Sequence, residues 1–288
     1  IEEIYGVDEN GKLWGKLYQF PDSATGSRTP YNWEEVDGKI NIKSATSYRE
    51  PDVTRNLTRY DIDAQISGYI NEETRYGMLA EEMEENYYEM INSIKKYGGF
   101  YIGRYETGGL NGTAVVRKMD TNIASQTWYT MYKKCKGLKG ENENIETSMI
   151  WGSLWDATLE WLVDVGAETT GGVKLTYKEV GSDSKDFGNY ENTTFEYINT
   201  NGEVVVKEIN TATLIPTGSA EYTKANNIYD MAGNVWDWTL EANSTGDRVT
   251  RCGSYSGVSY NYPADKRFNN NPTYSIFHYG CRAALYVK

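Results

Sequence analysis

Histidine, cysteine and proline are scarce in this sequence, and long apolar runs are absent. One histidine, His278, excludes a multi-histidine metal site, and three cysteines (Cys135, Cys252 and Cys281) fit neither a disulfide framework nor a zinc site. No apolar run reaches the roughly 18 residues of a membrane-spanning helix, so we expect no membrane insertion. Basic residues number 29 against 41 acidic ones, a net charge of −12 that argues against nucleic acid and anionic membranes as partners.

Tyrosine and glycine are abundant instead, at 25 and 28 of the 288 residues. Hydrophobic residues make up 39% of the chain, which is enough for a core and excludes wholesale disorder. The length suits one large domain, or one domain with an appendage. The chain begins at Ile1 with neither a Met nor a signal peptide, so we expect any export signal to be missing from it.

The first 75 residues are difficult to assign. Short β-like runs at Lys12–Tyr18 and Lys39–Lys43 stand between turn-forming clusters. We predict an N-terminal segment over residues 1–75, of uncertain role, that packs on the main domain or leads into it. The main domain is then residues 76–288.

Apolar periodicity predicts the elements that follow. Residues recurring every three or four positions indicate a helix over Leu79–Ile94 that ends at Gly98, and Phe100–Glu106 alternates as a strand. We also expect helices at Ser125–Lys134 and Trp151–Leu162, and a hairpin at Phe195–Ile209. Apolar residues at these spacings are typical of core packing, and the mixture of helices and strands indicates an α+β fold.

Four motifs in the second part of the chain carry a family resemblance. They are FYIGRYE at Phe100–Glu106, NIYDMAGNVWDW at Asn227–Trp238, RVTRCGSY at Arg248–Tyr255 and YGCRAAL at Tyr279–Leu285. In this order they resemble the formylglycine-generating-enzyme (sulfatase-modifying factor) branch of the C-type lectin fold. The resemblance implies an α+β C-type lectin fold of that subtype, with an irregular, loop-rich C-terminal region.

The resemblance does not imply catalysis, because one fold hosts different sites. Enzymes of this branch need two cysteines a few residues apart in the final loop region, as soft ligands for copper. Cys252 and Cys281 are 29 positions apart, and related iron enzymes need several histidines. We therefore expect no enzyme activity and no required cofactor, with a formylglycine-generating-type oxidase relative as an alternative.

The two motifs that flank the intervening stretch, Arg251–Ser254 and Gly280–Arg282, also resemble those of the variable proteins of diversity-generating retroelements. In those systems adenine-specific mutagenesis of AAY codons cannot produce Lys, Glu, Gln, Met or Trp. These five types make up 62 of the 288 residues, yet only Lys266 represents them in 252–281. The composition favours a variable region over 252–281, although turn-rich loops avoid Met and Trp for other reasons.

The same stretch has the composition of a binding surface. Seven of the 25 residues from 255 to 279 are aromatic, mixed with Ser, Gly and Asn as in an antibody paratope. Random substitution is tolerated only at exposed positions, so we expect these side chains to face solvent. The candidate ligand-binding residues are Tyr255, Ser256, Val258, Tyr260, Tyr262, Asp265, Phe268, Asn269, Tyr274, Ile276, Phe277, His278 and Tyr279.

The motifs on either side supply candidate scaffold anchors. Arg251 and Arg282 are expected to hold the loop base through carbonyls or carboxylates. One indole of Trp236 and Trp238 is expected to pack beneath the surface, with a core role for the other. Gly253, Ser254 and Gly280 complete the anchors. For Cys252 and Cys281, a disulfide across neighbouring strands and free buried thiols both remain open.

A calcium loop is implied by the same family resemblance. The matching positions are Asp230, Gly233, Val235 and Asp237, and hard oxygen ligands at this spacing suit Ca²⁺. A solvated turn is the alternative, because Asp237 replaces the longer Glu of the family pattern. Sugar-binding E-P-N or Q-P-D triplets are absent, so calcium-mediated sugar binding is not expected.

These observations together predict a non-catalytic receptor-recognition or adhesion protein with a retroelement-diversified surface. We expect its ligand to be a protein or glycan on another cell. The resemblance places the protein outside the cell, on a bacterial surface or a phage particle. An invariant bacterial surface or pilus adhesin subunit is the remaining alternative.

Overall fold

The computed structural model describes residues 18–19, 29–30, 32–36, 39–43, 73–242 and 247–288, with side chains described from residue 85 onward except at residue 242. Most of the predicted N-terminal segment, including nearly all of the Lys12–Tyr18 run, lies outside the described residues. The second run is strand β4 (Lys39–Lys43), which pairs with β3 (Asn32–Val36). The proposed boundary after residue 75 falls within the first turn of helix α2.

The predicted helices are confirmed. They are α2 (Glu73–Tyr97), α3 (Trp128–Lys136) and α4 (Gly152–Asp164). A short helix, α5 (Tyr177–Gly181), follows them in the chain. Helix α2 buries Tyr87, Met90, Ile91 and Ile94, the face that the periodicity predicts. It stops where Gly98 donates its N–H to the carbonyl of Ile94 at a φ of +79°.

Two sheets organise residues 101–287. The larger has the order β13-β12-β11-β14: β11 is Trp236–Ala242, β12 Arg248–Arg251, β13 Arg267–Asn270 and β14 Tyr279–Cys281. The smaller has the order β5-β15-β6, built from Tyr101–Ile102, Ala283–Val287 and Ile145–Met149. The predicted strand at Phe100–Glu106 is therefore much shorter than expected. Mixed helices and sheets confirm the α+β class.

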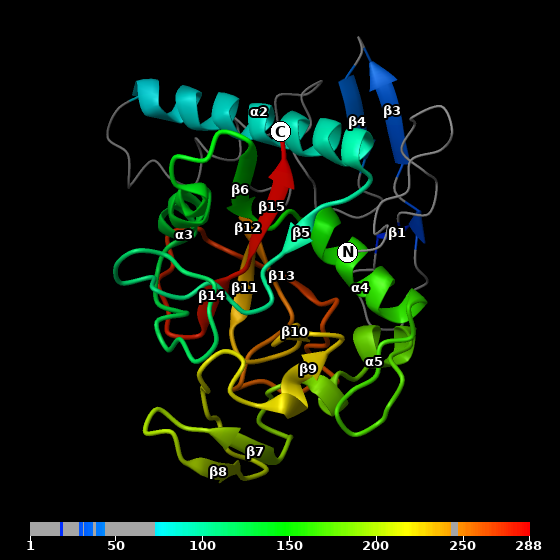
Figure 1. Cartoon of the computed structure of the whole chain (residues 1–288), viewed down its shortest axis with the longest axis vertical. Helices are drawn as coiled ribbons and strands as arrows, with labels where there is room; N and C mark the ends of the chain where they lie inside the picture. The colour runs from blue at the N-terminus through cyan, green and yellow to red at the C-terminus, as the bar shows by residue number, and fades with distance from the viewer. Residues whose placement is uncertain (1–17, 20–28, 31, 37–38, 44–72, 243–246) are drawn as a thin grey trace.

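Smaller elements complete the described chain. The predicted hairpin is β7 (Phe195–Ile198) with β8 (Val204–Lys207), and it lies at the opposite end of the molecule from α2 (Figure 1). Two further pairs are β9 (Lys224–Ala225) with β10 (Ile228–Tyr229), and β1 (Tyr18–Gln19) with β2 (Thr29–Pro30). Three 3₁₀ turns occupy Gly137–Lys139, Lys185–Phe187 and Glu221–Thr223. No helix in the described part of the chain is long and apolar enough to cross a bilayer.

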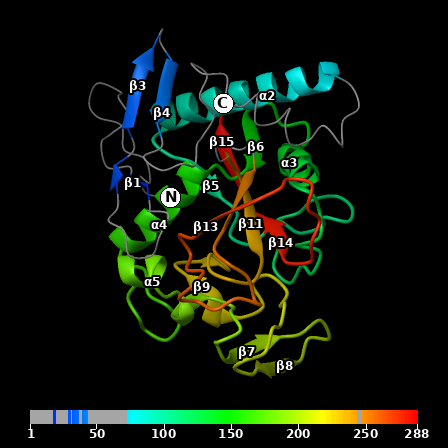
Figure 2. The same ribbon diagram turned by 180° about the vertical axis from the view of Figure 1, so that it is seen from behind.

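Strand β11 positions the candidate site. Side chains alternate across a strand, so Trp236 and Trp238 project from one face and Asp237 from the other. All three are buried, and the main core contains both indoles together with Trp128 and Trp155. The irregular segments 252–266 and 271–278 link β12, β13 and β14 on the side shown in Figure 2.

Candidate functional site

The stretch 252–281 is fixed at both ends to the same central strand. Strand β12, which precedes it, pairs antiparallel with β11, and β14, which closes it, pairs parallel with β11. Strand β13 lies within the stretch and pairs with β12. The intervening loops therefore start and finish on a rigid frame.

Six of the thirteen candidate side chains are exposed, and four of these are large aromatics. Tyr260 is 57% exposed, Phe268 44%, Tyr274 49% and Phe277 60%. Ser256 and Asn269 are exposed as well, and four others are half-buried: Val258, Tyr262, Ile276 and His278. Several large aromatics among small polar groups are typical of a contact surface.

Trp236 lies directly beneath this surface. Its ring centroid is 5.2 Å from that of Tyr262 and 5.5 Å from that of Phe268. Trp238 is fully buried and packs edge-on against Tyr279 at 5.0 Å. Both indoles belong to the main core, and of the two it is Trp236 that contacts side chains of the candidate surface.

Three candidates are not exposed, and for them the prediction of a solvent-facing side chain is wrong. Tyr279 is 5% exposed, because its ring packs on Trp238 and its hydroxyl donates to Asn270 Oδ1 at 2.6 Å. Tyr255 is 8% exposed, where burial raises its pKa. Asp265 is 2% exposed, and burial raises the pKa of its carboxyl group to about 7. These three residues belong to the buried structure that supports the surface.

The first predicted anchor, Arg251, belongs to a buried network of four charges. It donates to Asp156 Oδ1 at 2.6 Å and to the Asp265 carbonyl at 2.9 Å, and it lies 3.5 Å from Glu241 Oε2. Arg267, which lies opposite Arg251 in the β12–β13 register, also contacts Asp156 and donates to Glu241 Oε1 at 2.9 Å. Two positive and two negative side chains thus tie α4, β11, β12 and β13 together.

Sequence reasoning missed three members of this network. Asp156 lies 95 positions from Arg251, and Glu241 lies 26 positions from Arg267. No local pattern signals such distant partners. The signal that could have found the network is Arg267, which lies within 252–281, a stretch with few long charged side chains.

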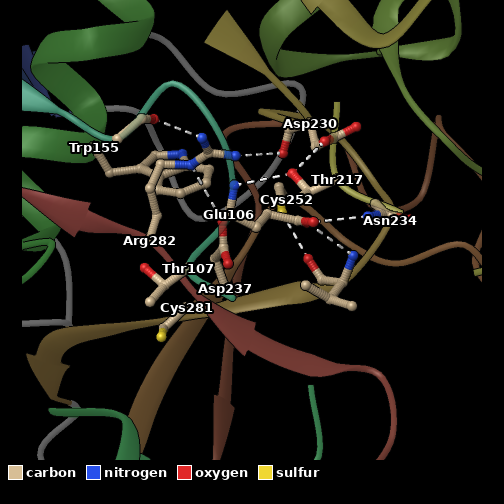
Figure 3. Close-up of polar contacts among 12 residues, drawn as sticks. Glu106, Thr107, Trp155, Thr217, Asp230, Asn234, Asp237, Cys252, Cys281 and Arg282 are labelled. Atoms are coloured by element: carbon tan, nitrogen blue, oxygen red, sulfur yellow. Dashed lines mark hydrogen bonds and ion pairs between the residues drawn. The ribbon is translucent and has the colours of Figure 1, made fainter. Parts of the chain in front are cut away.

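The second predicted anchor, Arg282, holds the other end (Figure 3). Its guanidinium donates to the carbonyls of Gly103 and Tyr229 at 2.8 Å and of Asp230 at 3.0 Å. Its Nε lies 3.5 Å from Asp237 Oδ2. Arg282 therefore joins the small sheet to the DMAGNVW loop.

The three small anchors occupy tight positions. A Cβ on Gly280 would lie 2.4 Å from Val235 Cγ2, and one on Gly253 would lie 2.7 Å from the carbonyl oxygen of Tyr262. Gly253 also has a φ of +77°, which favours glycine. Ser254 is buried, with its hydroxyl 3.2 Å from that of Ser256.

The four predicted calcium ligands have protein neighbours in this arrangement. The carboxylate of Asp230 already accepts hydrogen bonds from Thr217, Thr223 and the Gly218 N–H. Asp237 faces Arg282 instead. Among the described residues, no group of three or more His, Cys, Asp or Glu side chains could hold a metal.

The thiol of Cys252 contacts the two backbone carbonyl groups that the resemblance predicts as calcium ligands. Cys252, at a φ of +69°, places its Sγ 3.2 Å from the Val235 carbonyl oxygen and 3.8 Å from that of Gly233. Burial raises the Cys252 pKa well above its usual value, and the neighbouring Asp237 adds to this. The group is therefore a protonated donor toward these carbonyls.

A second buried carboxyl group, Glu106, completes this interior cluster. It accepts from Asn234 Nδ2 at 2.7 Å and from the Val235 N–H at 3.3 Å. Burial raises the pKa of Glu106 well above its usual value and that of Asp237 to about 7. Glu106 and Asn234 thus link the FYIGRYE motif to the DMAGNVW motif.

The Cys252–Cys281 disulfide alternative fails on sheet order. Strand β12, which ends one residue before Cys252, and β14, which contains Cys281, flank β11 on opposite sides, about 9–10 Å apart at two strand spacings. A disulfide needs Cα atoms within about 7 Å. In this structure all three cysteines are buried free thiols.

Residues 158–287 match the family described as Sulfatase-modifying factor enzyme 1-like domain. The match confirms the resemblance of the three C-terminal motifs, which all lie within it. No curated protein matches the chain. Among solved structures, the chain is similar to Treponema denticola variable protein 1, with 16% identity over 67% of this chain and 79% of that chain and a TM-score of 0.34.

Proposed function

We propose that this chain, whose residues 158–287 match the sulfatase-modifying-factor family, is a non-catalytic ligand-binding protein. Its binding surface comprises the exposed and half-buried side chains of residues 252–281. The observation that carries the proposal is the contrast between exposed Tyr260, Tyr274 and Phe277 and the buried arginines that fix both ends of the stretch. Aromatic side chains on a rigid base give contact area at low conformational entropy loss.

The same surface is proposed to be diversified by adenine-specific mutagenesis. Two features support this. Only Lys266 represents the five residue types that such mutagenesis cannot produce. Substitution of exposed side chains on a fixed backbone typically changes stability by about 0.5 kcal/mol or less, so the frame tolerates changes at the surface.

A non-catalytic role is supported by the state of the cysteines. Burial raises the pKa of Cys252 and Cys281 well above the usual value, so both are poor nucleophiles. We further propose that no calcium is required, because the Asp230 carboxylate and the Val235 carbonyl already have protein partners.

The ligand is proposed to be a protein or glycan on another cell, with this protein carried on a bacterial surface or a phage particle. The net charge of −12 supports a partner other than nucleic acid or anionic lipid. A surface of Tyr, Phe, Asn and Ser has no strong charge of either sign, which suits contact through aromatic packing and neutral hydrogen bonds.

Binding of the fluorescently labelled protein to a panel of intact bacterial cells and to a glycan array tests the proposal. Tyr260→Ala combined with Phe277→Ala removes two of the most exposed aromatics. We expect at least a tenfold loss of affinity, since aromatic anchors dominate such interfaces. Tyr101→Ala is the matched control, because Tyr101 is 53% exposed on β5 and lies outside the surface. Equal losses in both proteins, or none in the double variant, would refute the assignment.

A further inference from the structure

Two cysteines that are distant in sequence meet in the core beside the candidate surface. Cys135 lies in the last turn of α3, and Cys281 ends β14, 146 positions later. Their Sγ atoms are 3.6 Å apart, and neither side chain is exposed. The motif resemblance did not involve Cys135.

In these surroundings, each of the two sulfurs has the other as its nearest candidate for a disulfide bond. Cys135 Sγ lies 3.8 Å from the Thr107 hydroxyl, which also lies beside Cys281 (Figure 3). Cys252 instead points its sulfur at the Val235 carbonyl, on the far side of β11. Among the described residues there is no third Cys, His or carboxylate to complete a metal site with the pair.

We propose that Cys135 and Cys281 form a disulfide when the chain folds under oxidising conditions. Two S–H bonds break and one S–S bond forms. The two electrons and two protons pass to an external disulfide oxidant such as oxidised glutathione, which leaves as two thiols. The sulfurs must approach from 3.6 Å to about 2.05 Å for the bond to form.

The bond would connect α3 to the strand that ends the candidate surface. Closing so long a stretch of chain restricts the unfolded state strongly, and the stabilisation is largest for long loops. Because both thiols are buried, and burial raises the pKa of Cys281, exchange in the folded protein is slow in either direction. The bond therefore forms during folding and afterwards resists reductant.

Refolding of the wild-type protein in oxidised or in reduced glutathione, followed by alkylation in denaturant and peptide mapping, tests the proposal. We expect the oxidised sample to contain a cross-linked peptide pair carrying Cys135 and Cys281, with only Cys252 alkylated. Its Tm should exceed that of the reduced sample by about 5–15 °C. Cys252→Ser is the matched control and should keep both the cross-link and the shift.

Three alkylated cysteines in the oxidised sample would overturn the proposal, and so would a cross-link that involves Cys252. The comparison uses one protein in two redox states, so it does not depend on the folding of a Cys135 or Cys281 variant. It is also independent of ligand binding.

Discussion

Four buried charges decide, at the residue scale, how the base of the candidate surface is held. Asp156, Glu241, Arg251 and Arg267 are all 2% exposed or less, and their formal charges cancel. Burial raises the pKa of Glu241, while Arg267 and Arg251 lower it. In such a set, removal of one charge leaves another without compensation in a low-dielectric interior.

Asp156→Asn is therefore expected to lower the free energy of unfolding by about 3–5 kcal/mol. The neutral amide cannot balance the two arginines that the carboxylate contacts. Denaturant-induced unfolding measures the change. Asp164→Asn, an exposed position on the same helix α4, should change it by no more than about 0.5 kcal/mol. Similar values for both variants would show that the network does not stabilise the fold.

Asp265 links stability to pH. Burial raises the pKa of its carboxyl group to about 7, and Arg251 and Arg267 offset this only in part. The unfolded value is about 3.9, so the folded state binds this proton more tightly. The contribution of Asp265 to stability is complete below about pH 4 and is lost as the pH rises to about 7.

Asp265→Asn keeps this side chain neutral at every pH. We expect the unfolding free energy of the variant to rise relative to wild type between pH 4 and 7, by up to about 1.4 kcal/mol per pH unit. Unfolding curves at several pH values measure the difference. A difference that stays constant across this range would contradict the assignment, and Asp164→Asn supplies the control for a surface carboxylate.

At the scale of elements, β11 connects the interior to the surface. Its Trp236 supports Tyr262 and Phe268, and its Asp237 faces Arg282 on the opposite side. In the loop that precedes it, Asp230–Val235, Thr217 donates to the Asp230 carboxylate and Cys252 to the Val235 carbonyl. This loop is stabilised from within the chain.

Calcium is consequently expected to leave the thermal stability unchanged. The Tm in EDTA should equal the Tm with excess calcium chloride, and magnesium chloride is the matched control for ionic strength. A Tm that rises with calcium concentration but not with magnesium would show a site that stabilises the folded state.

The sequence predicted the local elements well, because helices and hairpins follow from short-range patterns. Apolar spacing identified α2, and the hairpin predicted at Phe195–Ile209 is β7 with β8. Exposure within 252–281 was predicted less well. Irregular loops have no period, so nothing local distinguishes buried Tyr279 from exposed Tyr274. Partners such as Asp156 come from distant segments and need the tertiary structure.

At the scale of the whole molecule, the chain separates a fixed interior from the face that is proposed to vary. The anchors at both ends of 252–281 reach α4, β11 and the small sheet. Buried positions such as Asp265, Arg267 and Tyr279 serve this interior, although they lie inside the stretch proposed to vary. Substitution there would disrupt packing or leave charges unpaired.

Sequencing of sister copies of this protein from one population tests the central claim most directly. We expect differences to concentrate within 252–281, at exposed or half-buried positions such as Tyr260, Tyr274, Phe277 and His278, and at codons templated by adenine. Arg251, Arg267 and Arg282 should be unchanged. Sister copies that are identical in this stretch, or that vary equally at the buried arginines, would contradict the account.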